Sequence, residues 1–351
     1  MTSTDPVVTA VVGYGYAGRC FHSYLVRLAE PGLSLKGVVS SRAEAREAIA
    51  AEGLRAWERF EEVLADDEVE LVVLATPNDL HAPQAIAALE AGKHVVTDKP
   101  MSLDGAEADA MIAAARRAGR LLSVFQNRRW DGDYLTVRQL LADGTLGDLV
   151  YAQLAWGQYG APRSWRGRAA SGGGKFVDLG AHMIDQALQL APGPLQRVYA
   201  RLSDAGLDND VEDHAHCVLS FGGGAEIHVV TSSIARIPMP RWYVLGTEGA
   251  LVKEGLDPQE PAMVAGDIDS AREDDRLLWP RLSRHRDGRP LEEVLEPVAG
   301  RWRCYYENVA AAIRGREALA VTPESVRAVM GVIDAARESA RSGRAVEIAA
   351  S

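Results

Sequence analysis

The sequence predicts an α/β protein of two domains, a doubly wound parallel sheet followed by an α+β domain with a large, mostly antiparallel, open-faced sheet. The first third of the chain alternates short β-branched runs with alanine-rich helical runs, which is typical of parallel strands covered by helices on both faces. Between residues 197 and 253, strand-like segments follow one another with short turns, which favours antiparallel pairing. The length of 351 residues also exceeds what one compact core usually contains.

The expected first domain covers residues 1–126. Its strands are short apolar runs, and a helical run follows each of the first four. The strands are expected at Val7–Val12, Leu35–Ser40, Leu71–Ala75, His94–Thr97 and Leu121–Phe125, and the helices at Tyr16–Leu28, Arg42–Glu52, Ala82–Ala91 and Asp104–Ala118.

The expected second domain covers residues 127–351. Strand-like segments dominate its middle, and Gly222–Gly224 is expected as a hairpin turn between two of them. Residues 257–297 are polar and rich in proline, and we expect a long surface excursion there. Helices are expected at Tyr134–Ala142, Phe176–Leu190, Tyr305–Arg314 and Thr322–Ser342, and strands at Leu149–Trp156, Arg197–Ser203, Ala215–Phe221, Glu226–Ser232, Arg241–Leu245 and Ala250–Lys253.

The composition excludes several classes of partner. The net charge is −11, and an acidic surface repels phosphate backbones, so nucleic acid is not expected. No apolar run approaches the roughly 20 residues of a membrane helix, so no membrane partner is expected. Cys20, Cys217 and Cys304 are far apart and form no CxxC pair, which indicates neither a zinc site nor a disulfide framework. We therefore expect a cytoplasmic protein without bound metal.

A glycine-rich turn follows the first predicted strand and opens the first predicted helix. Residues Gly13–Gly18 fit the pattern G-x-G-x-x-G, which is weak alone but specific within a strand–helix–strand unit. Gly13 permits the tight turn, Gly15 lets backbone N–H groups approach a pyrophosphate, and Gly18 lets the helix pack close to the sheet. The pattern predicts a dinucleotide cofactor at the helix N-terminus.

The tip of the second strand indicates which dinucleotide binds. An NAD site usually has an acidic residue there, about 20 residues past the turn, but this chain has Ser40, Ser41 and Arg42. Two hydroxyls and a guanidinium suit a ribose 2′-phosphate, which a carboxylate would repel. We therefore expect NADP(H) rather than NAD. An exposed first-turn arginine without a ligand is the alternative for Arg42.

Two further strand ends are expected to face the cofactor, because ligands bind at the carboxyl ends of parallel strands. Thr76-Pro77-Asn78 follows one strand, and Asp98-Lys99-Pro100 follows another. A lysine beside the nicotinamide can hold a substrate oxygen and take part in proton transfer, whereas a surface lysine in a turn is the alternative. The expected cofactor contacts are Gly13, Gly15, Tyr16, Ala17, Gly18, Ser40, Ser41, Arg42, Thr76, Pro77, Asn78, His81, Asp98 and Lys99.

Asp178 and His182 are four residues apart in a predicted helix, so they share one face. A histidine with an acidic neighbour can act as a general acid and base. A helical ion pair or a buried core histidine would show the same spacing.

Four segments in this order and spacing resemble the glucose–fructose oxidoreductase / inositol dehydrogenase (Gfo/Idh/MocA) family: GYGYAGR, ATPN, AGKHVVTDKP and GGGKFVDLGAHMIDQAL. The likeness covers nearly the whole chain. SVFQNRRWDGDYLTV and KEGLDPQE look similar to its NADP-dependent scyllo-inositol dehydrogenase-like branch. The resemblance implies a Rossmann domain followed by an open-faced sheet domain.

The resemblance also implies roles for three residues. Lys99 matches the catalytic lysine of the family's Glu-Lys-Pro motif, His182, assisted by that lysine, is the expected proton carrier, and Asp178 is expected to orient substrate hydroxyls. Asp98 departs from the family's usual glutamate, and its shorter reach is expected to shift the lysine slightly. Gln126 departs from the histidine common in the branch, which leaves the substrate open. Expected substrate contacts are Asn127, Arg128, Trp130, Tyr159, Trp165 and Arg166, although loop and interface packing would explain them equally well.

Three functions fit these residues. The first is an NADP-dependent dehydrogenase of a cyclitol or sugar. The second is a ketoreductase of a nucleotide-linked sugar or of an aminocyclitol or antibiotic precursor, and Arg163, Arg166 and Arg168 would give a nucleotide-linked sugar its cationic contacts. The third, a non-catalytic NADP-sensing protein, predicts the loss of at least one of Lys99, Asp178 and His182, and all three are present. The uncovered sheet face predicts a homodimer or homotetramer.

Overall fold

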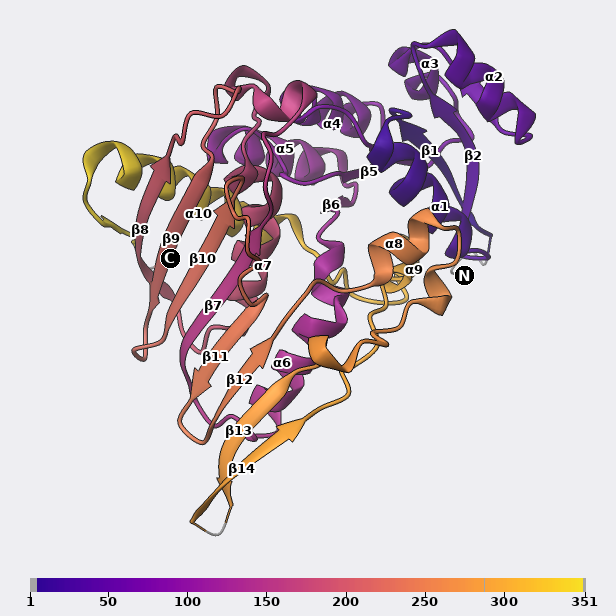
Figure 1. Cartoon of the computed structure of the whole chain (residues 1–351). Coiled ribbons are helices and arrows are strands. Elements are labelled where there is room, and N and C mark those ends of the chain that lie inside the picture. Colours follow the sequence, from indigo (N-terminus) through magenta and orange to yellow (C-terminus); the bar gives the residue numbers. More distant parts are fainter. Residues whose placement is uncertain (1–4, 287, 350–351) are drawn as a thin grey trace. The chain divides into compact units, whose positions relative to one another are not determined.

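The computed structural model describes residues 5–286 and 288–349, and their contacts divide the chain into two compact units (Figure 1). The first unit comprises Met1–Asn127 and Trp302–Met330, and the second Arg128–Arg301 and Gly331–Ser351. Everything after residue 126 was expected to belong to the second domain, whereas residues 302–330 group with the first unit. Aromatic packing accounts for this grouping, since the Phe125 ring lies 5.0 Å from that of Tyr305.

The first unit contains a six-stranded parallel sheet in the order β3-β2-β1-β4-β5-β6, which is the strand order of a Rossmann fold. Its strands are β1 (Val7–Val12), β2 (Leu33–Val39), β3 (Arg55–Trp57), β4 (Leu71–Leu74), β5 (His94–Thr97) and β6 (Leu122–Val124). Its helices are α1 (Ser23–Leu28), α2 (Ala43–Ala51), α3 (Phe60–Leu64), α4 (His81–Glu90), α5 (Gly105–Ala118) and α9 (Arg303–Ile313).

Local sequence explains most of these elements. All four residues of β4 are buried, as expected for a strand covered on both faces. The Asp104 side chain accepts a hydrogen bond from the Glu107 N–H and caps α5, which ends at Gly119 in the left-handed conformation. The edge strand β3 and helix α3 were not predicted, because β3 spans three residues and pairs with β2 alone.

The second unit is built on a nine-stranded sheet in the order β14-β13-β12-β11-β7-β10-β9-β8-β15. Strands β7 and β10 pair in parallel, and the other neighbours pair antiparallel. Its strands are β7 (Leu149–Gly157), β8 (Leu195–Ser203), β9 (His214–Phe221), β10 (Glu226–Ser232), β11 (Trp242–Gly246), β12 (Gly249–Lys253), β13 (Arg281–Arg286), β14 (Arg289–Val294) and β15 (Val346–Glu347).

Helices pack on one face of this sheet. Figure 1 shows α6 (Gly132–Ala142) and α7 (Ala181–Leu190) along that face, and the Tyr134 ring of α6 lies 6.4 Å from the Trp242 ring of β11. On β9, buried residues alternate with half-exposed ones along the whole strand, and β10 begins with the same alternation. This alternation means that one sheet face is packed and the other is in contact with solvent.

The segment 257–297 differs from the expected surface excursion. It contains helix α8 (Gln259–Val264) and the hairpin of β13 and β14, which extends the sheet at its edge. The hairpin was missed because its strands are rich in charge, as edge strands often are. Arg284 and Glu293 form a cross-strand ion pair at 2.9 Å.

The final helix α10 (Pro323–Ser342) crosses the division between the units. Thr322 precedes it, and the Thr322 hydroxyl accepts a hydrogen bond from the Ser325 N–H at 3.2 Å, as a helix cap does. Within the described residues, no helix has the length and apolar character that a membrane crossing requires.

Candidate functional site

The glycine turn lies at the carboxyl edge of the first sheet, directly after β1. Gly13 has φ +104°, and a Cβ there would lie 2.5 Å from the Ala75 carbonyl oxygen. A Cβ on Gly18 would lie 2.0 Å from the Gly13 oxygen. At Gly15, by contrast, no atom of the described residues lies within 4 Å of such a Cβ, apart from Gly15 itself and its immediate surroundings in the chain. Gly13 and Gly18 therefore allow backbone segments to touch, while Gly15 leaves open space in which a pyrophosphate can approach the main chain.

The helix after this turn begins differently from the expected single α-helix. Ala17–His22 forms a π-helical turn, which continues directly into α1. The Arg19 N–H donates to the Gly15 carbonyl at 3.0 Å. π-helical turns are rare and frequently occur at functional sites.

Two arginines lie at the tip of β2. The Arg42 guanidinium donates to the Tyr14 carbonyl at 3.0 Å, which holds it beside the glycine turn. Arg46 donates to the carbonyls of Ser40 and Ser41 at 3.0 and 2.9 Å. Arg46 was not predicted as a cofactor contact, although its position one helical turn after Arg42 would have indicated it. The tip of β2 thus carries two guanidinium groups.

His81 ties two of the expected cofactor segments together. Its ring is fully buried, with Nδ1 2.8 Å from the Pro100 oxygen and Nε2 3.0 Å from the Thr76 oxygen. Burial lowers the pKa of His81, against the opposing influence of Asp98. Both ring nitrogens therefore face main-chain carbonyls, of which a neutral imidazole donates to one, and the ring packs between the loop after β4 and the loop after β5. Nearby, the Thr76 hydroxyl donates to the Gln84 amide oxygen at 2.7 Å, and Asn78 is buried.

Lys99 follows β5 in a turn that Asp98 organises. The Asp98 carboxylate accepts a hydrogen bond from the Lys99 N–H at 2.8 Å, and its second oxygen lies 3.6 Å from His22 Nε2. Burial opposes the charged form of Asp98, but the interaction with His22 and the neighbouring charges of His22, Lys99 and His81 outweigh it and lower the pKa of Asp98 to about 2. Asp98 is thus a carboxylate that fixes the backbone of Lys99.

His22 is a residue that sequence reasoning missed. Its ring is fully buried, and Nδ1 lies 2.6 Å from the Tyr306 hydroxyl. The available signal was its position four residues after Gly18, on the helix face that packs against the sheet. Tyr306 belongs to α9, far along the chain, so its contact with His22 had no local signal.

In the second unit, Asp178 and His182 lie on consecutive helical segments. Asp178 belongs to a π-helical turn over Phe176–Gly180, and His182 to the first turn of α7. The sequence predicted one α-helix here, so the expected i,i+4 face is altered by the wider π turn. His182 is buried, whereas 28% of the Asp178 side chain is exposed.

Glu212 holds the start of this helical region and was not predicted. It accepts a hydrogen bond from the Phe176 N–H at 2.7 Å. Gly174 has φ +114°, and a Cβ there would lie 2.6 Å from a Glu212 oxygen. Burial raises the pKa of Glu212, which its backbone hydrogen bonds oppose. The glycine is therefore required for the close approach of this carboxylate.

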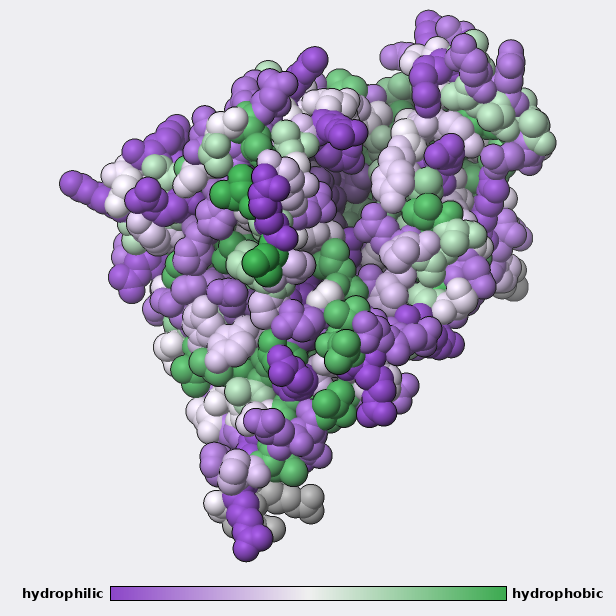
Figure 2. All heavy atoms as spheres, in the orientation of Figure 1, coloured by the Kyte–Doolittle hydropathy of each residue, from purple (hydrophilic) through white to green (hydrophobic). Residues whose placement is uncertain are grey.

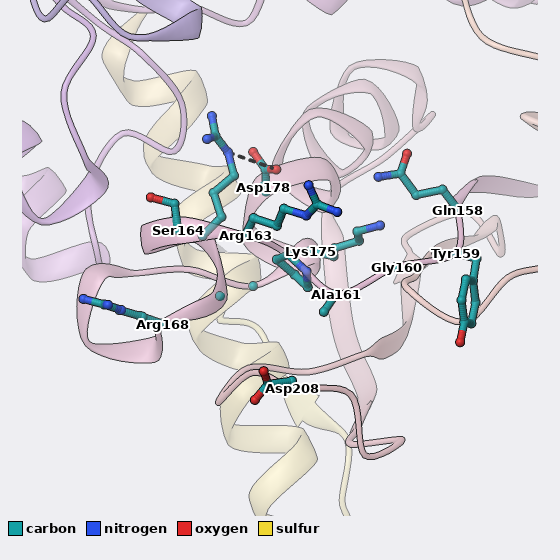
Figure 3. Close-up of a pocket in the computed structure, with 14 residues that line it drawn as sticks. Gln158, Tyr159, Gly160, Ala161, Arg163, Ser164, Arg168, Lys175, Asp178 and Asp208 are labelled. Atoms are coloured by element: carbon teal, nitrogen blue, oxygen red, sulfur yellow. Dashed lines mark ion pairs between the residues drawn. The ribbon is translucent and has the colours of Figure 1, made fainter.

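A cavity of about 810 Å³ opens beside Asp178 (Figure 3). The cavity brings together Tyr159, Arg166 and Asp178 of the predicted site. Arg166 forms an ion pair with Asp178 at 3.6 Å, and its guanidinium lies over the Trp165 ring at 4.5 Å. Sequence reasoning did not select four other polar lining residues as substrate contacts: Gln158, Ser164, Lys175 and Asp208.

Arg128 and Trp130 do not line this cavity. Arg128 is buried, pairs with Asp131 at 3.2 Å and Glu260 at 3.0 Å, and lies over the Trp156 ring. The Trp130 carbonyl accepts from the Arg301 N–H at 2.9 Å. Asn127 is also buried and belongs to the first unit. The segment around Arg128 is thus engaged in packing within the protein.

The candidate residues are divided between the two units. The glycine turn, the two arginines at the tip of β2 and the Lys99 turn belong to the first, and the cavity with Asp178 belongs to the second. The described residues contain no group of three or more histidine, cysteine, aspartate or glutamate side chains arranged to hold a metal ion.

Comparison with known proteins gives matches over both units. The model of the oxidoreductase family with an NAD-binding Rossmann fold matches residues 7–126, and that of the GFO/IDH/MocA C-terminal domain matches residues 134–252. The scyllo-inositol 2-dehydrogenase (NADP(+)) IolW of Bacillus subtilis (strain 168) is 33% identical over 349 residues, which cover 97% of this chain and 96% of that protein.

Two other relatives extend the comparison. The levoglucosan dehydrogenase of Pseudarthrobacter phenanthrenivorans is 28% identical, with 63% of this chain and 65% of that enzyme covered. The solved structure of the yvaA oxidoreductase from Bacillus subtilis matches with a TM-score of 0.92 at 31% identity, covering 99% of each chain. Sequence and fold agree over nearly the full length, and the chain belongs to the GFO/IDH/MocA family of oxidoreductases.

Proposed function

We propose that this protein is an NADP-dependent oxidoreductase that transfers a hydride between the nicotinamide C4 and a secondary alcohol or ketone of a cyclitol or sugar. The observation that carries the proposal is the position of Lys99. It follows β5 at the same carboxyl edge of the parallel sheet as the glycine turn after β1, where such sheets bind ligands. The name of the Bacillus subtilis relative, an NADP(+)-dependent scyllo-inositol 2-dehydrogenase, supports the cofactor and the substrate class.

The residues of the first unit fit the expected dinucleotide. Gly15 faces open space at the start of a helix, so a pyrophosphate can reach the N–H groups there. Arg42 and Arg46 at the tip of β2 suit a 2′-phosphate, because guanidinium groups bind phosphate with paired hydrogen bonds. NADP(H) supplies the hydride or accepts it. NAD is the less favoured cofactor.

The remaining roles belong to three side chains. Lys99 holds the substrate oxygen with its ammonium group and stabilises negative charge as the carbonyl is reduced. His182, assisted by Lys99, carries the proton between that oxygen and solvent. Asp178 accepts hydrogen bonds from neighbouring substrate hydroxyls, and Arg166 holds its carboxylate in place.

The experiment that tests this function is a spectrophotometric assay of NADPH oxidation with a panel of keto-inositols and keto-sugars. We expect turnover with at least one of them and a lower KM for NADPH than for NADH. A protein that binds NADPH but oxidises it with no member of the panel would support a sensing role instead. Equal KM values for the two cofactors would contradict the NADP preference.

We further propose that the protein forms a homodimer or homotetramer through the solvent-facing side of the nine-stranded sheet. Tyr243 is a large exposed residue on β11, and its ring lies 6.4 Å from that of the half-buried Tyr151 on β7, whose hydroxyl lies 3.3 Å from Nδ1 of the half-buried His228 on β10. Figure 2 shows hydrophobic residues between hydrophilic ones over the β11–β14 part of this unit. Light scattering should give a multiple of the 37.8 kDa chain mass, and a monomer would contradict the proposal.

A further inference from the structure

Lys175 has a buried ammonium group and lines the cavity beside Asp178. Only 5% of this residue is exposed, and its Nζ has no hydrogen-bond partner among the residues that the structure describes. The other two buried lysines of the described chain are partnered: Lys93 donates to the Asp66 carbonyl at 2.8 Å, and Lys253 donates to the Glu254 carbonyl. Lys175 thus differs from both in its surroundings.

A buried ammonium without a partner is unfavourable, because it gives up hydration and receives nothing in exchange. Burial lowers the pKa of Lys175, and only the charge of Asp178 opposes this effect. Asp178 is already shared with Arg166, at 3.6 Å. A ligand that brings a negative charge to Lys175 would therefore give its ammonium group the charged hydrogen-bond acceptor that the described residues do not provide.

The other charges of the cavity favour the same kind of ligand. Arg163, Arg166 and Arg168 line it together with Lys175, against two acidic residues, Asp178 and Asp208. This excess of cations occurs on a chain whose net charge is −11. In Figure 3, Arg163 and Lys175 lie on the Gln158 side of the cavity, whereas Arg168 extends away from them. Lys175 and Arg163 therefore form the cationic part of the cavity nearest to Gln158.

We propose that this cavity binds an acidic group of the substrate, so that the hydride acceptor or donor is an anionic sugar or cyclitol, with Lys175 as its central contact and Arg163 at the rim. The anion is a carboxylate, as in a sugar acid, or a phosphate ester, since both oxyanions accept hydrogen bonds from ammonium and guanidinium groups. The proposal deepens the function proposed above and rests on it for the reaction.

The test is calorimetric binding to the NADP⁺-saturated protein, with glucose, glucuronate and glucose 6-phosphate as probes. We expect the wild-type protein to bind at least one of the two acids about 10- to 100-fold more tightly than glucose, as charged hydrogen bonds allow. Lys175→Met should remove most of this preference and leave glucose binding within about 3-fold of wild type. Lys175→Arg should retain the preference, and the acid that shows it identifies the anion as carboxylate or phosphate.

Two controls separate a binding role from a structural one. Arg289→Gln removes one exposed positive charge on β14 of the same unit, outside the cavity, and should leave all three affinities unchanged. Without ligand, Lys175→Met should have a higher Tm than wild type, because it removes an uncompensated buried charge. A Lys175→Met protein with a lower Tm would assign Lys175 to the fold and contradict the proposal.

Two binding outcomes would also overturn it. Wild-type protein that binds neither acid more tightly than glucose, including protein that binds none of the three, has no anion subsite. Equal weakening of all three probes by Lys175→Met would make Lys175 a contact for hydroxyls alone. The proposed reaction and the proposed anion subsite can fail separately. Turnover of neutral ketones without a preference for acids would support the reaction and contradict the anion subsite. Acid binding that depends on Lys175, without any turnover, would support the anion subsite and contradict the reaction.

Discussion

His22 Nε2 lies 3.6 Å from an oxygen of Asp98, and Nδ1 of the same ring lies 2.6 Å from the Tyr306 hydroxyl. This relationship joins the helix of the glycine turn, the turn that carries Lys99 and helix α9 within one unit. Because the Asp98 carboxylate also accepts the Lys99 N–H, His22 is expected to act as a positioning residue for Lys99.

The first prediction concerns His22→Phe, which preserves an aromatic ring but removes both nitrogens. We expect kcat/KM to fall by about 10- to 100-fold, because small displacements of a reacting group are costly. Tyr306→Phe removes only the hydroxyl that contacts His22 Nδ1, so it should lower kcat/KM by a smaller factor. Steady-state kinetics of both variants measure this, and wild-type values for His22→Phe would show that Lys99 is placed without it.

The same contact predicts a pH dependence of stability. The pKa of Asp98 is lowered from 3.8 to about 2, so its stabilising contribution of about 2 kcal/mol is present above pH 3.8 and is lost as the pH falls through 2. In His22→Phe, burial of Asp98 is no longer opposed by the histidine, so this contribution should be smaller above pH 3.8, where Asp98 is charged in both states. Unfolding free energies of wild type and variant between pH 2 and pH 7 should therefore converge as the pH falls. A constant difference would exclude the Asp98 coupling.

Lys99→Met should reduce turnover by about 10²- to 10⁴-fold, since it removes the group that holds the substrate oxygen and assists proton transfer. The dissociation constant of NADPH should change only modestly, because the glycine turn and Arg42 remain. Lys36→Met is the matched control: Lys36 pairs with Asp66 and Glu68, outside the Lys99 turn. Near-normal rates for Lys99→Met would remove the lysine from the chemistry.

Arg42→Ala should weaken NADPH binding by about 10- to 100-fold, because it removes a charged hydrogen bond to the 2′-phosphate. NADH, which lacks this phosphate, should bind with nearly unchanged affinity. Fluorescence titration with both cofactors measures the difference. An equal loss for NADPH and NADH would point to the hydrogen bond between Arg42 and the Tyr14 carbonyl as its main role.

His182→Ala should lower turnover at the proton-transfer step, by about 10²- to 10⁴-fold. The wild-type pH–rate profile should contain an ionisation that the variant lacks, whereas NADPH binding should remain. Single-turnover kinetics across the pH range test both expectations. If rate and profile are unchanged, the buried ring of His182 is a core residue.

Much of the fold could be predicted because its signals are local. Strand β1 has the predicted bounds Val7–Val12, and β5 the predicted bounds His94–Thr97, because apolar β-branched runs flanked by turn residues define strands directly. Gly13 has φ +104°, which agrees with the predicted tight turn, because glycine adopts positive φ readily. The hairpin of β13 and β14 was missed because an edge strand has no buried face to impose an apolar period.

The parts of the site that could not be predicted depend on contacts between distant residues. His22 and Tyr306 are 284 positions apart, so no spacing rule connects them. The cap from Glu212 to the Phe176 N–H spans 36 positions. The burial of Lys175 also depends on the folded cavity, since a lysine after three glycines is ordinarily exposed.

The central claim is that Lys99 and His182 act on the reacting oxygen of a substrate beside the nicotinamide, while Asp178 holds a neighbouring hydroxyl of the same substrate. The most direct test is a crystal structure of the protein with NADP⁺ and a substrate polyol. The account predicts the Lys99 Nζ and a His182 ring nitrogen within about 2.6–3.2 Å of the reacting oxygen, and Asp178 hydrogen-bonded to a neighbouring hydroxyl. A complex in which these three side chains contact different molecules, or face away from the nicotinamide, would contradict it.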